Sequence, residues 1–148
     1  MGFDGNKKIK GFKQQIVVDT MGFLYGIYLH AANLFDSTQG IYAVNNVSEK
    51  TLKKVKIIIA DKGYRKTFIE DCEKLNLKVF ISGIDLPKKN ETKTKGFNLD
   101  PTRWIVERTI AWICQSRRLI VNFEKTFSSQ SAFIWLTMLH LGIKKLIT

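Results

Sequence analysis

The run Ile57-Ile58-Ile59 is the feature of the sequence that most restricts its fold. So short an apolar run, rich in β-branched residues, is typical of a strand covered on both faces, as in α/β proteins. The run is soon followed by Asp61-Lys62-Gly63, which is a turn signal. We therefore predict a strand over residues 56–60 that is buried on both sides.

Segments with strand and helix periodicity alternate around this run. In chain order the pattern predicts two strands and a tight turn within 9–31, a helix at 36–54 with Ser37 as its N-cap, the strand at 56–60, an amphipathic helix at 64–75, a strand at 79–81, an exposed lysine-rich loop at 87–95, a helix at 102–119 and a last helix from about 128 to 147. The last helix is apolar on most sides, so we expect it to be buried. This order predicts an α/β sandwich with a mixed sheet flanked by helices.

The charge of the chain points to an anionic partner. Its 148 residues have a formal net charge of +11, while hydrophobic residues make up 45% and argue for a folded domain. Nucleic acid is the commonest partner of such a basic domain, because each Lys or Arg on a phosphate releases condensed counterions. The arginines are concentrated, since four of the five lie within residues 103–118.

Other classes of protein are made improbable by what the sequence lacks. No apolar stretch has the length of a signal peptide or of a membrane-spanning helix, so we expect a cytoplasmic protein without a membrane partner. Cys72 and Cys114 are far apart, and we expect both to be reduced and buried. With only His30 and His140 besides, a zinc site is improbable. The three tryptophans are expected in the core rather than under nucleic-acid bases.

Two acidic residues are candidates for chemistry, and each has a structural alternative. Asp61 follows the predicted buried strand, and ligands bind at the carboxyl ends of strands in open α/β sheets. Taken alone, however, Asp61 is more often a turn residue that binds its own backbone. Glu107 lies four residues after Arg103 on the predicted helix, and therefore on the same face. It could be a metal ligand beside a phosphate site or half of a surface salt bridge.

Four motifs follow one another along the chain. They are Lys7-Lys8-Ile9-Lys10-Gly11 with Ile16-Val17-Val18-Asp19-Thr20-Met21-Gly22, then His30-Ala31-Ala32-Asn33 with Asp36, then Ile59-Ala60-Asp61-Lys62-Gly63-Tyr64, and finally Arg103-Trp104-Ile105-Val106-Glu107-Arg108-Thr109 with Ala111-Trp112, Arg117-Arg118-Leu119 and Phe123-Glu124. From about Lys7 to the C-terminus, and at plausible spacing, these motifs resemble the catalytic domain of DDE-type transposases of bacterial insertion sequences. One such stretch would be weak evidence, whereas four in register are strong.

The resemblance implies a ribonuclease H-like fold in which Asp61 and Glu107 are the second and third catalytic acids and bind Mg²⁺ (or Mn²⁺). Members of the family cut DNA at transposon ends and join the freed 3′-hydroxyl to target DNA, so both DNAs are implied partners and the bacterial nucleoid is the implied place of action. Tyr64 could contact this DNA or simply pack. The residues expected at the DNA are Lys7, Lys8, Lys10, Lys13, Tyr64, Arg103, Arg108, Arg117 and Arg118.

The chain also departs from the family pattern. The family's first catalytic Asp lies on a strand upstream of the lysine-rich motif, and neither Asp4, in an expected turn, nor Asp19, before the hairpin turn, replaces it. Related transposases have a Tyr and a Lys around Arg103 and Glu107; here Asp100 and Cys114 stand at those positions, with Arg117 or Arg118 as substitutes for the Lys.

We therefore expect residues 1–148 to form a single partial catalytic domain without the first, central strand, inactive alone. Unpaired buried backbone groups cost about 1–3 kcal/mol each, against a total domain stability of about 5–15 kcal/mol. The isolated chain should be poorly stable unless an N-terminal transposase polypeptide or an intact transposase supplies the strand. The alternatives are a non-catalytic DNA-binding remnant that regulates intact transposase, and a ribonuclease H-like nuclease that uses another acid.

Overall fold

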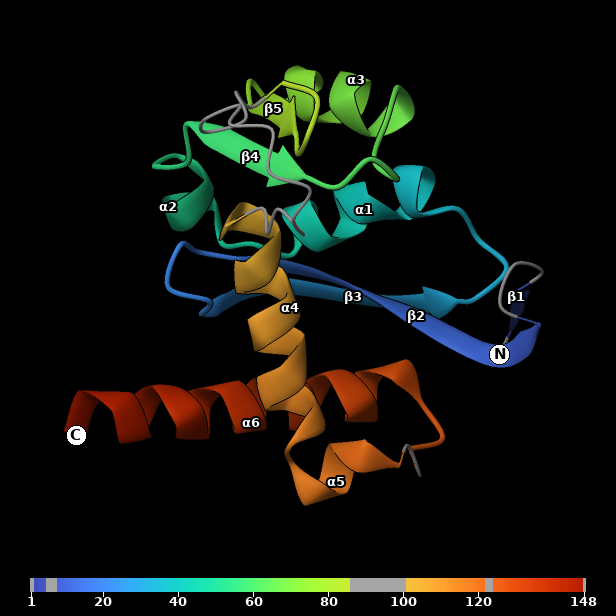
Figure 1. The fold of residues 1–148 in the computed structure, drawn as a ribbon, viewed down its shortest axis with the longest axis vertical. Coiled ribbons are helices and arrows are strands. Elements are labelled where there is room, and N and C mark those ends of the chain that lie inside the picture. The colour runs from blue at the N-terminus through green and yellow to red at the C-terminus, as the bar shows by residue number, and fades with distance from the viewer. Residues whose placement is uncertain (1, 5–7, 86–100, 122–123, 148) are drawn as a thin grey trace, which may run out of the picture.

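The computed structural model describes residues 2–4, 8–85, 101–121 and 124–147 (Figure 1), and the predicted loop at 87–95 lies outside these ranges. The elements, in chain order, are β1 (Gly2–Asp4), β2 (Ile9–Val18), β3 (Leu24–Ala31), α1 (Asp36–Asn45), α2 (Glu49–Leu52), β4 (Ile57–Ala60), α3 (Thr67–Lys74), β5 (Lys78–Ile81), α4 (Pro101–Cys114), α5 (Arg117–Ile120) and α6 (Phe127–Ile147). The predicted α/β class is confirmed.

The first sheet contains β1, β2 and β3, all antiparallel and in that order. β2 and β3 form a long hairpin, in which Phe12 pairs with Ala31 at one end and Val18 with Leu24 at the other. The turn of the hairpin contains Gly22 with φ of 86°, a left-handed conformation that glycine adopts without a steric penalty. The hairpin confirms the predicted strand–turn–strand unit, whereas β1 replaces the turn expected around Asp4.

The second sheet contains β4 and β5, which pair in parallel from Ile57 with Lys78 to Ala60 with Ile81. Among the described strands these two form a sheet of their own, so the mixed sheet that was predicted without its central strand is present as two smaller sheets. Ile57 and Ile59 are 50% and 43% exposed, while Ile58 packs against the core from the other face. The prediction of a strand buried on both faces is therefore wrong, because the described elements cover one face of β4.

Two hydrophobic cores hold these layers together. The first lies between the hairpin and helices α4 and α6, and its buried members are Leu24, Ile27, Leu29, Ile113, Ile134 and Met138. The second joins α1, α3 and the β4–β5 sheet around Val44, Phe68, Cys72 and Leu77. Val17 of β2 also packs against the second core. Figure 1 shows α1 between the hairpin and the β4–β5 sheet, in contact with β2, β3 and α3.

The helix predicted at 36–54 is two helices. α1 begins after Phe35, so Ser37 is not its N-cap. Near its end the Asn46 side chain donates a hydrogen bond to the carbonyl oxygen of Ile27 at 2.8 Å, and Ser48 then caps α2 by accepting from the Thr51 amide. The polar residues at 45–48 thus end one helix and start another. Similarly, the helix predicted at 102–119 divides into α4 and α5, and the one predicted at 64–75 begins three residues later.

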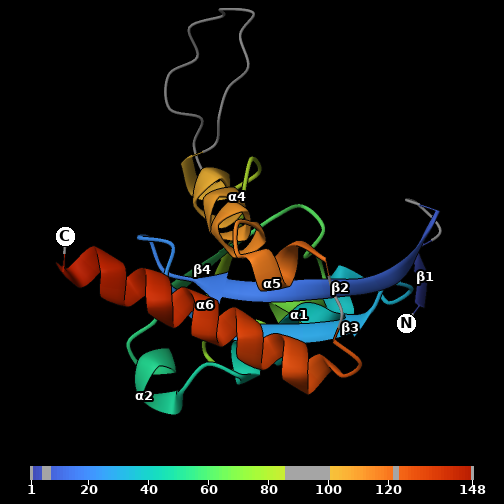
Figure 2. The ribbon, with the colours of Figure 1, turned by 90° about the horizontal axis from the view of Figure 1, so that it is seen from below.

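α6 is buried along one side only. Gln130, Ile134 and Met138 are its buried residues, and its C-terminal turns extend past the hairpin (Figure 2). The expectation of burial on most sides is wrong, because apolar composition does not say which face finds a partner. The exposed large apolar residues of α6 are Phe127, Trp135, Leu136, Leu139, Ile143, Leu146 and Ile147.

The predictions about the cysteines and tryptophans are confirmed for some of these residues and wrong for others. Cys72 is buried as expected, whereas Cys114 is exposed. Trp112 packs against the first core, but Trp104 is 51% exposed on α4 and Trp135 is 39% exposed on α6. The core interpretation therefore holds for Trp112 and is wrong for the other two.

Candidate functional site

Asp61 stands where β4 passes into a tight turn. The backbone amide of Tyr64 closes this turn by donating to the carbonyl oxygen of Asp61 at 2.9 Å. The Asp61 side chain is exposed, and its Oδ1 accepts from the Lys62 amide at 2.7 Å. The carboxylate thus stabilises its own turn and is still reachable from solvent, so the structural and functional interpretations of Asp61 are compatible.

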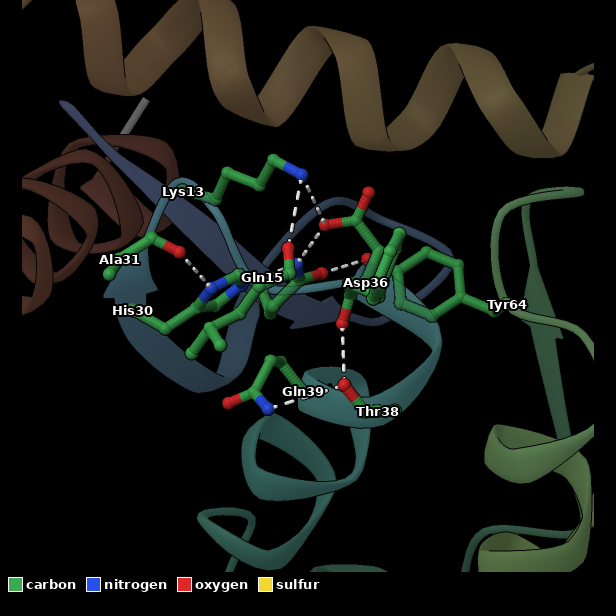
Figure 3. Close-up of polar contacts among 10 residues, drawn as sticks. Lys13, Gln15, His30, Ala31, Asp36, Thr38, Gln39 and Tyr64 are labelled. Carbon is green, nitrogen blue, oxygen red and sulfur yellow. Dashed lines mark hydrogen bonds and ion pairs between the residues drawn. The ribbon is translucent and has the colours of Figure 1, made fainter. Parts of the chain in front are cut away.

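The side chain of Tyr64, at the other end of the turn, is directed into the protein (Figure 3). Its hydroxyl donates to Oε1 of Gln15, and its ring packs on Phe68 with 5.1 Å between the ring centroids. A Cβ at Gly40 would lie 2.7 Å from the same ring, so the ring rests directly on the backbone of α1. In the structure, the side chain of Tyr64 therefore packs inside the protein.

Gln15 is the centre of a buried polar network that joins β2, β3, α1 and this turn (Figure 3). Gln15 is 4% exposed; its Nε2 donates to Oδ1 of Asp36 at 2.8 Å and lies 3.0 Å from Nε2 of His30. His30 Nδ1 lies 2.9 Å from the carbonyl oxygen of Ala31. Since a carbonyl can only accept, Nδ1 carries the hydrogen and Nε2 accepts from Gln15. His30 is therefore a structural member of the network.

Charges around the network reinforce it. Burial raises the pKa of the Tyr64 hydroxyl well above its usual value, and the carboxylates of Asp36 and Asp61 raise it further, so the hydroxyl remains a donor. Lys13 Nζ lies 3.6 Å from Oδ1 of Asp36 and donates to the carbonyl oxygen of Leu34 at 3.2 Å. Lys13 is therefore engaged in neutralising the network.

Glu107 lies on α4 and is exposed. Arg103, one turn earlier, donates from Nε to Oε1 of Glu107 at 2.8 Å, and the two side chains are 62% and 48% exposed. Such an exposed ion pair is worth under about 1 kcal/mol. Of the two interpretations of Glu107, the structure therefore shows the surface salt bridge. A carboxylate held this weakly stays available to a stronger cationic ligand.

The two residues after Glu107 attach α4 to the hairpin turn. Arg108 Nη2 donates to the carbonyl oxygen of Met21 at 2.8 Å, and its guanidinium lies over the Trp112 ring, 4.9 Å from the centroid. Thr109 is completely buried, and its hydroxyl donates to the carbonyl oxygen of Gly22 at 2.8 Å. Arg108 thus has a structural role that the sequence did not reveal.

The other basic residues predicted to contact DNA are distributed over several elements. Arg118 on α5 pairs with Glu124, with 2.9 Å between Nη2 and Oε1. The remaining members of the set are Lys8 and Arg117, which are exposed, and Lys7 and Lys10, whose side chains lie outside the described part of the chain.

The carboxylates of Asp61 and Glu107 are hard oxygen ligands of the kind that Mg²⁺ and Mn²⁺ prefer. Within the described ranges, however, no three His, Cys, Asp or Glu side chains lie together so as to hold a metal ion. The donor chemistry of each carboxylate therefore suits a divalent cation.

Comparison with known proteins shows the family to which the chain belongs. The family model described as "Transposase DDE domain" matches residues 2–141. The chain belongs to this transposase family. Over 130 residues it is 30% identical to a protein of Burkholderia cepacia named "Putative transposase for insertion sequence element IS402", an alignment that covers 84% of this chain and 59% of the relative. The family inferred from the four motifs is confirmed.

The transposase chain thus spans about 59% of the length of that relative. No solved structure matches it. In the part of the transposase that the structure describes, no helix is long and apolar enough to cross a membrane.

The role of Gln15 in this transposase was not predicted from the sequence. The available signal was a pair of glutamines, Gln14-Gln15, at the start of the apolar stretch of β2. Because strand side chains alternate between faces, one of two adjacent glutamines must point to the covered face and needs a polar partner there. The partners, Asp36 and Tyr64, are far away in sequence and could not be read from the strand itself.

Proposed function

We propose that this transposase domain takes part in metal-dependent DNA cleavage and strand transfer at the ends of an insertion sequence. The observation that carries the proposal is the family match over residues 2–141, together with the exposed carboxylate of Asp61 at the carboxyl end of β4. Asp61 and Glu107 are proposed as two of the catalytic acids. The reaction would take place on chromosomal DNA in the bacterial cytoplasm.

Asp61 and Glu107 would hold Mg²⁺ (or Mn²⁺). Bound at such a site, divalent cations activate the attacking oxygen and stabilise the leaving oxygen of a phosphodiester. Arg103, now paired with Glu107, would turn to the DNA backbone when the carboxylate binds metal. The exposed residues Lys8 and Arg117 would add contacts to phosphates, which orient the DNA without reading its sequence.

We further propose that the domain is ribonuclease H-like and is completed by a strand between β2 and β4. Among the described strands, β4 pairs only with β5, and the outer edge of β2 pairs with β1 only at Ile9–Gly11. In Figure 1 the arrows of β3 and β4 point the same way, so a strand parallel to β4 would be antiparallel to β2. Such a strand, from an N-terminal transposase polypeptide or an intact transposase, would bring a further carboxylate and satisfy both edges.

Without that strand the domain would be inactive, and the alternative function is that of a non-catalytic DNA-binding regulator. The net charge of +11 favours DNA binding whether or not the acids work. A chain that offers the same edges as an active transposase would compete for the same strand or the same DNA. It would then lower the activity of intact transposase by mixed assembly.

A hybrid protein tests the proposal. In it, this chain replaces the matching part of the Burkholderia cepacia relative, and cleavage and joining of insertion-sequence end DNA are measured with Mg²⁺ or Mn²⁺. We expect activity that Asp61→Ala and Glu107→Ala each abolish. Asp71→Ala is the matched control, because that acid pairs with Lys74 within α3.

Full activity after removal of Asp61 or Glu107 would reject the site. If instead the hybrid is inert and the unaltered chain inhibits the intact relative, the regulatory alternative is favoured. Binding of the chain alone to DNA should weaken steeply with salt in either case, because both proposals rely on phosphate contacts.

A further inference from the structure

The turn that carries Asp61 is attached to the first sheet by hydrogen bonds from its far end. Asp61 and Tyr64 are the two ends of one turn, closed by the 2.9 Å backbone bond between them. The Tyr64 hydroxyl donates to Gln15 on β2, 49 residues earlier in the chain. Since β4 and β5 form a sheet separate from the hairpin among the described strands, this bond ties the two sheets together close to Asp61.

Gln15 is a firm point of attachment. The two hydrogens of its amide serve Asp36 and His30, so its Oε1 has one orientation, toward Tyr64 (Figure 3). Asp36 is in turn close to Lys13. Buried networks of this kind, with every member satisfied, rigidify their surroundings. The bond from Tyr64 therefore ends on a side chain that cannot readily rotate.

The ring of Tyr64 is positioned independently of its hydroxyl. It lies against Phe68 and against the backbone of α1 at Gly40, where a Cβ would approach the ring to 2.7 Å. Any residue other than glycine at position 40 would push the ring outward. The packing of the ring and the hydrogen bond of the hydroxyl thus both fix the position of Tyr64 at the end of the turn.

We propose that Tyr64, acting through Gln15, is a positioning residue that fixes the Asp61 turn against the β2–β3 hairpin and thereby sets the place of the Asp61 carboxylate. The catalytic consequence rests on the proposed function of Asp61, whereas the attachment of the turn does not. Asp36 and Tyr64, which belong to two separate motifs, are joined by Gln15 for this one purpose. Tyr64 touches neither metal nor DNA in this assignment.

The substitution Tyr64→Phe tests the attachment, because it removes one oxygen and leaves the ring on Gly40. Hydrogen exchange of the full chain is followed by mass spectrometry, which works at low protein concentration. We expect peptides covering residues 61–64 to exchange about two- to tenfold faster, as loss of one hydrogen bond implies. Peptides of β3 should keep their protection. Tyr42→Phe is the matched control, since that exposed tyrosine of α1 has its ring tilted against Tyr28.

Binding of Mn²⁺, used alone as the probe and followed by electron paramagnetic resonance, separates this inference from the proposed function. We expect Asp61→Asn to remove the binding and Tyr64→Phe to weaken it by about two- to tenfold. Gly40→Ala, which displaces the ring and keeps the hydroxyl, should loosen the same turn. It serves as the second variant if Tyr64→Phe does not fold.

Unchanged exchange at residues 61–64 in Tyr64→Phe would overturn the inference. An equal increase over the whole chain would also overturn it, because Tyr64 would then be an ordinary stabilising residue. Faster exchange confined to the turn, with Mn²⁺ binding unaffected by Asp61→Asn, would support the attachment and remove the metal assignment of Asp61.

Discussion

Replacing Thr109 with valine tests how α4 is attached to the hairpin. Valine keeps the shape of the side chain and removes the hydroxyl that donates to Gly22 at 2.8 Å in a completely buried position. The carbonyl of Gly22 then loses this partner inside the protein, at a cost of about 1–3 kcal/mol. In a chain of 148 residues each 1 kcal/mol shifts Tm by about 2–4 °C, so we expect Tm to fall by about 2–12 °C.

Urea titration in the cold, followed by tryptophan fluorescence, measures this loss. Trp112 is a suitable reporter because its ring carbon lies 3.1 Å from the position that a Cβ of Gly22 would take. Thr137→Val is the matched control, since its half-buried hydroxyl makes only a long 3.3 Å bond to Ser116 and should change the free energy of unfolding by about 0.5 kcal/mol or less. The reasoning is refuted if Thr109→Val is as mild as the control.

Three further results follow from burial. Ile134→Val should lower the free energy of unfolding by about 0.5–1.5 kcal/mol and Leu139→Ala by about 0.5 kcal/mol or less; equal losses in urea titrations would contradict the one-sided burial of α6. Burial raises the pKa of the Cys72 thiol from 9.0 to about 11, so the unreactive thiol form persists below that pH. Iodoacetamide at mildly alkaline pH should therefore label only Cys114 in the folded chain and both cysteines in denaturant, which mass spectrometry can check. Rapid labelling of Cys72 in the folded chain would count against its burial. Gly26→Ala should cost about 1–3 kcal/mol, because the added methyl overlaps the α1 backbone, and an unchanged urea midpoint would disprove that close approach.

The α/β class, the hairpin and the short strand at 57–60 could be predicted because they depend on local patterns. Alternation of apolar residues, Gly22 in a turn and Asp61 after a strand are all visible within a few residues of chain. The family could be inferred because its motifs are contiguous. These predictions, which depend on local patterns or on short motifs, were thus confirmed.

Some predictions that depend on distant partners were wrong, and some roles were not predicted at all. Whether Ile57 and Ile59 are covered depends on what packs on the outer face of β4, and the exposed side of α6 depends on what adjoins it. The role of Arg108 depends on a backbone carbonyl 87 residues earlier in the chain. The helix boundaries at 45–48 could not be predicted for a different reason. Several polar residues could each have served as a cap, and the hydrogen bond from Asn46 to β3 decides among them.

The contact between Gly22 and Thr109 has a consequence for the order in which the newly made polypeptide folds. The hairpin leaves the ribosome before the residues that cover its apolar face, Ile113, Ile134 and Met138, which follow about a hundred residues later. At roughly 5–20 residues per second, the apolar side of β3 remains uncovered for several seconds during synthesis. Such a nascent chain is a natural client of chaperones, and its final assembly must wait for the last helix to emerge.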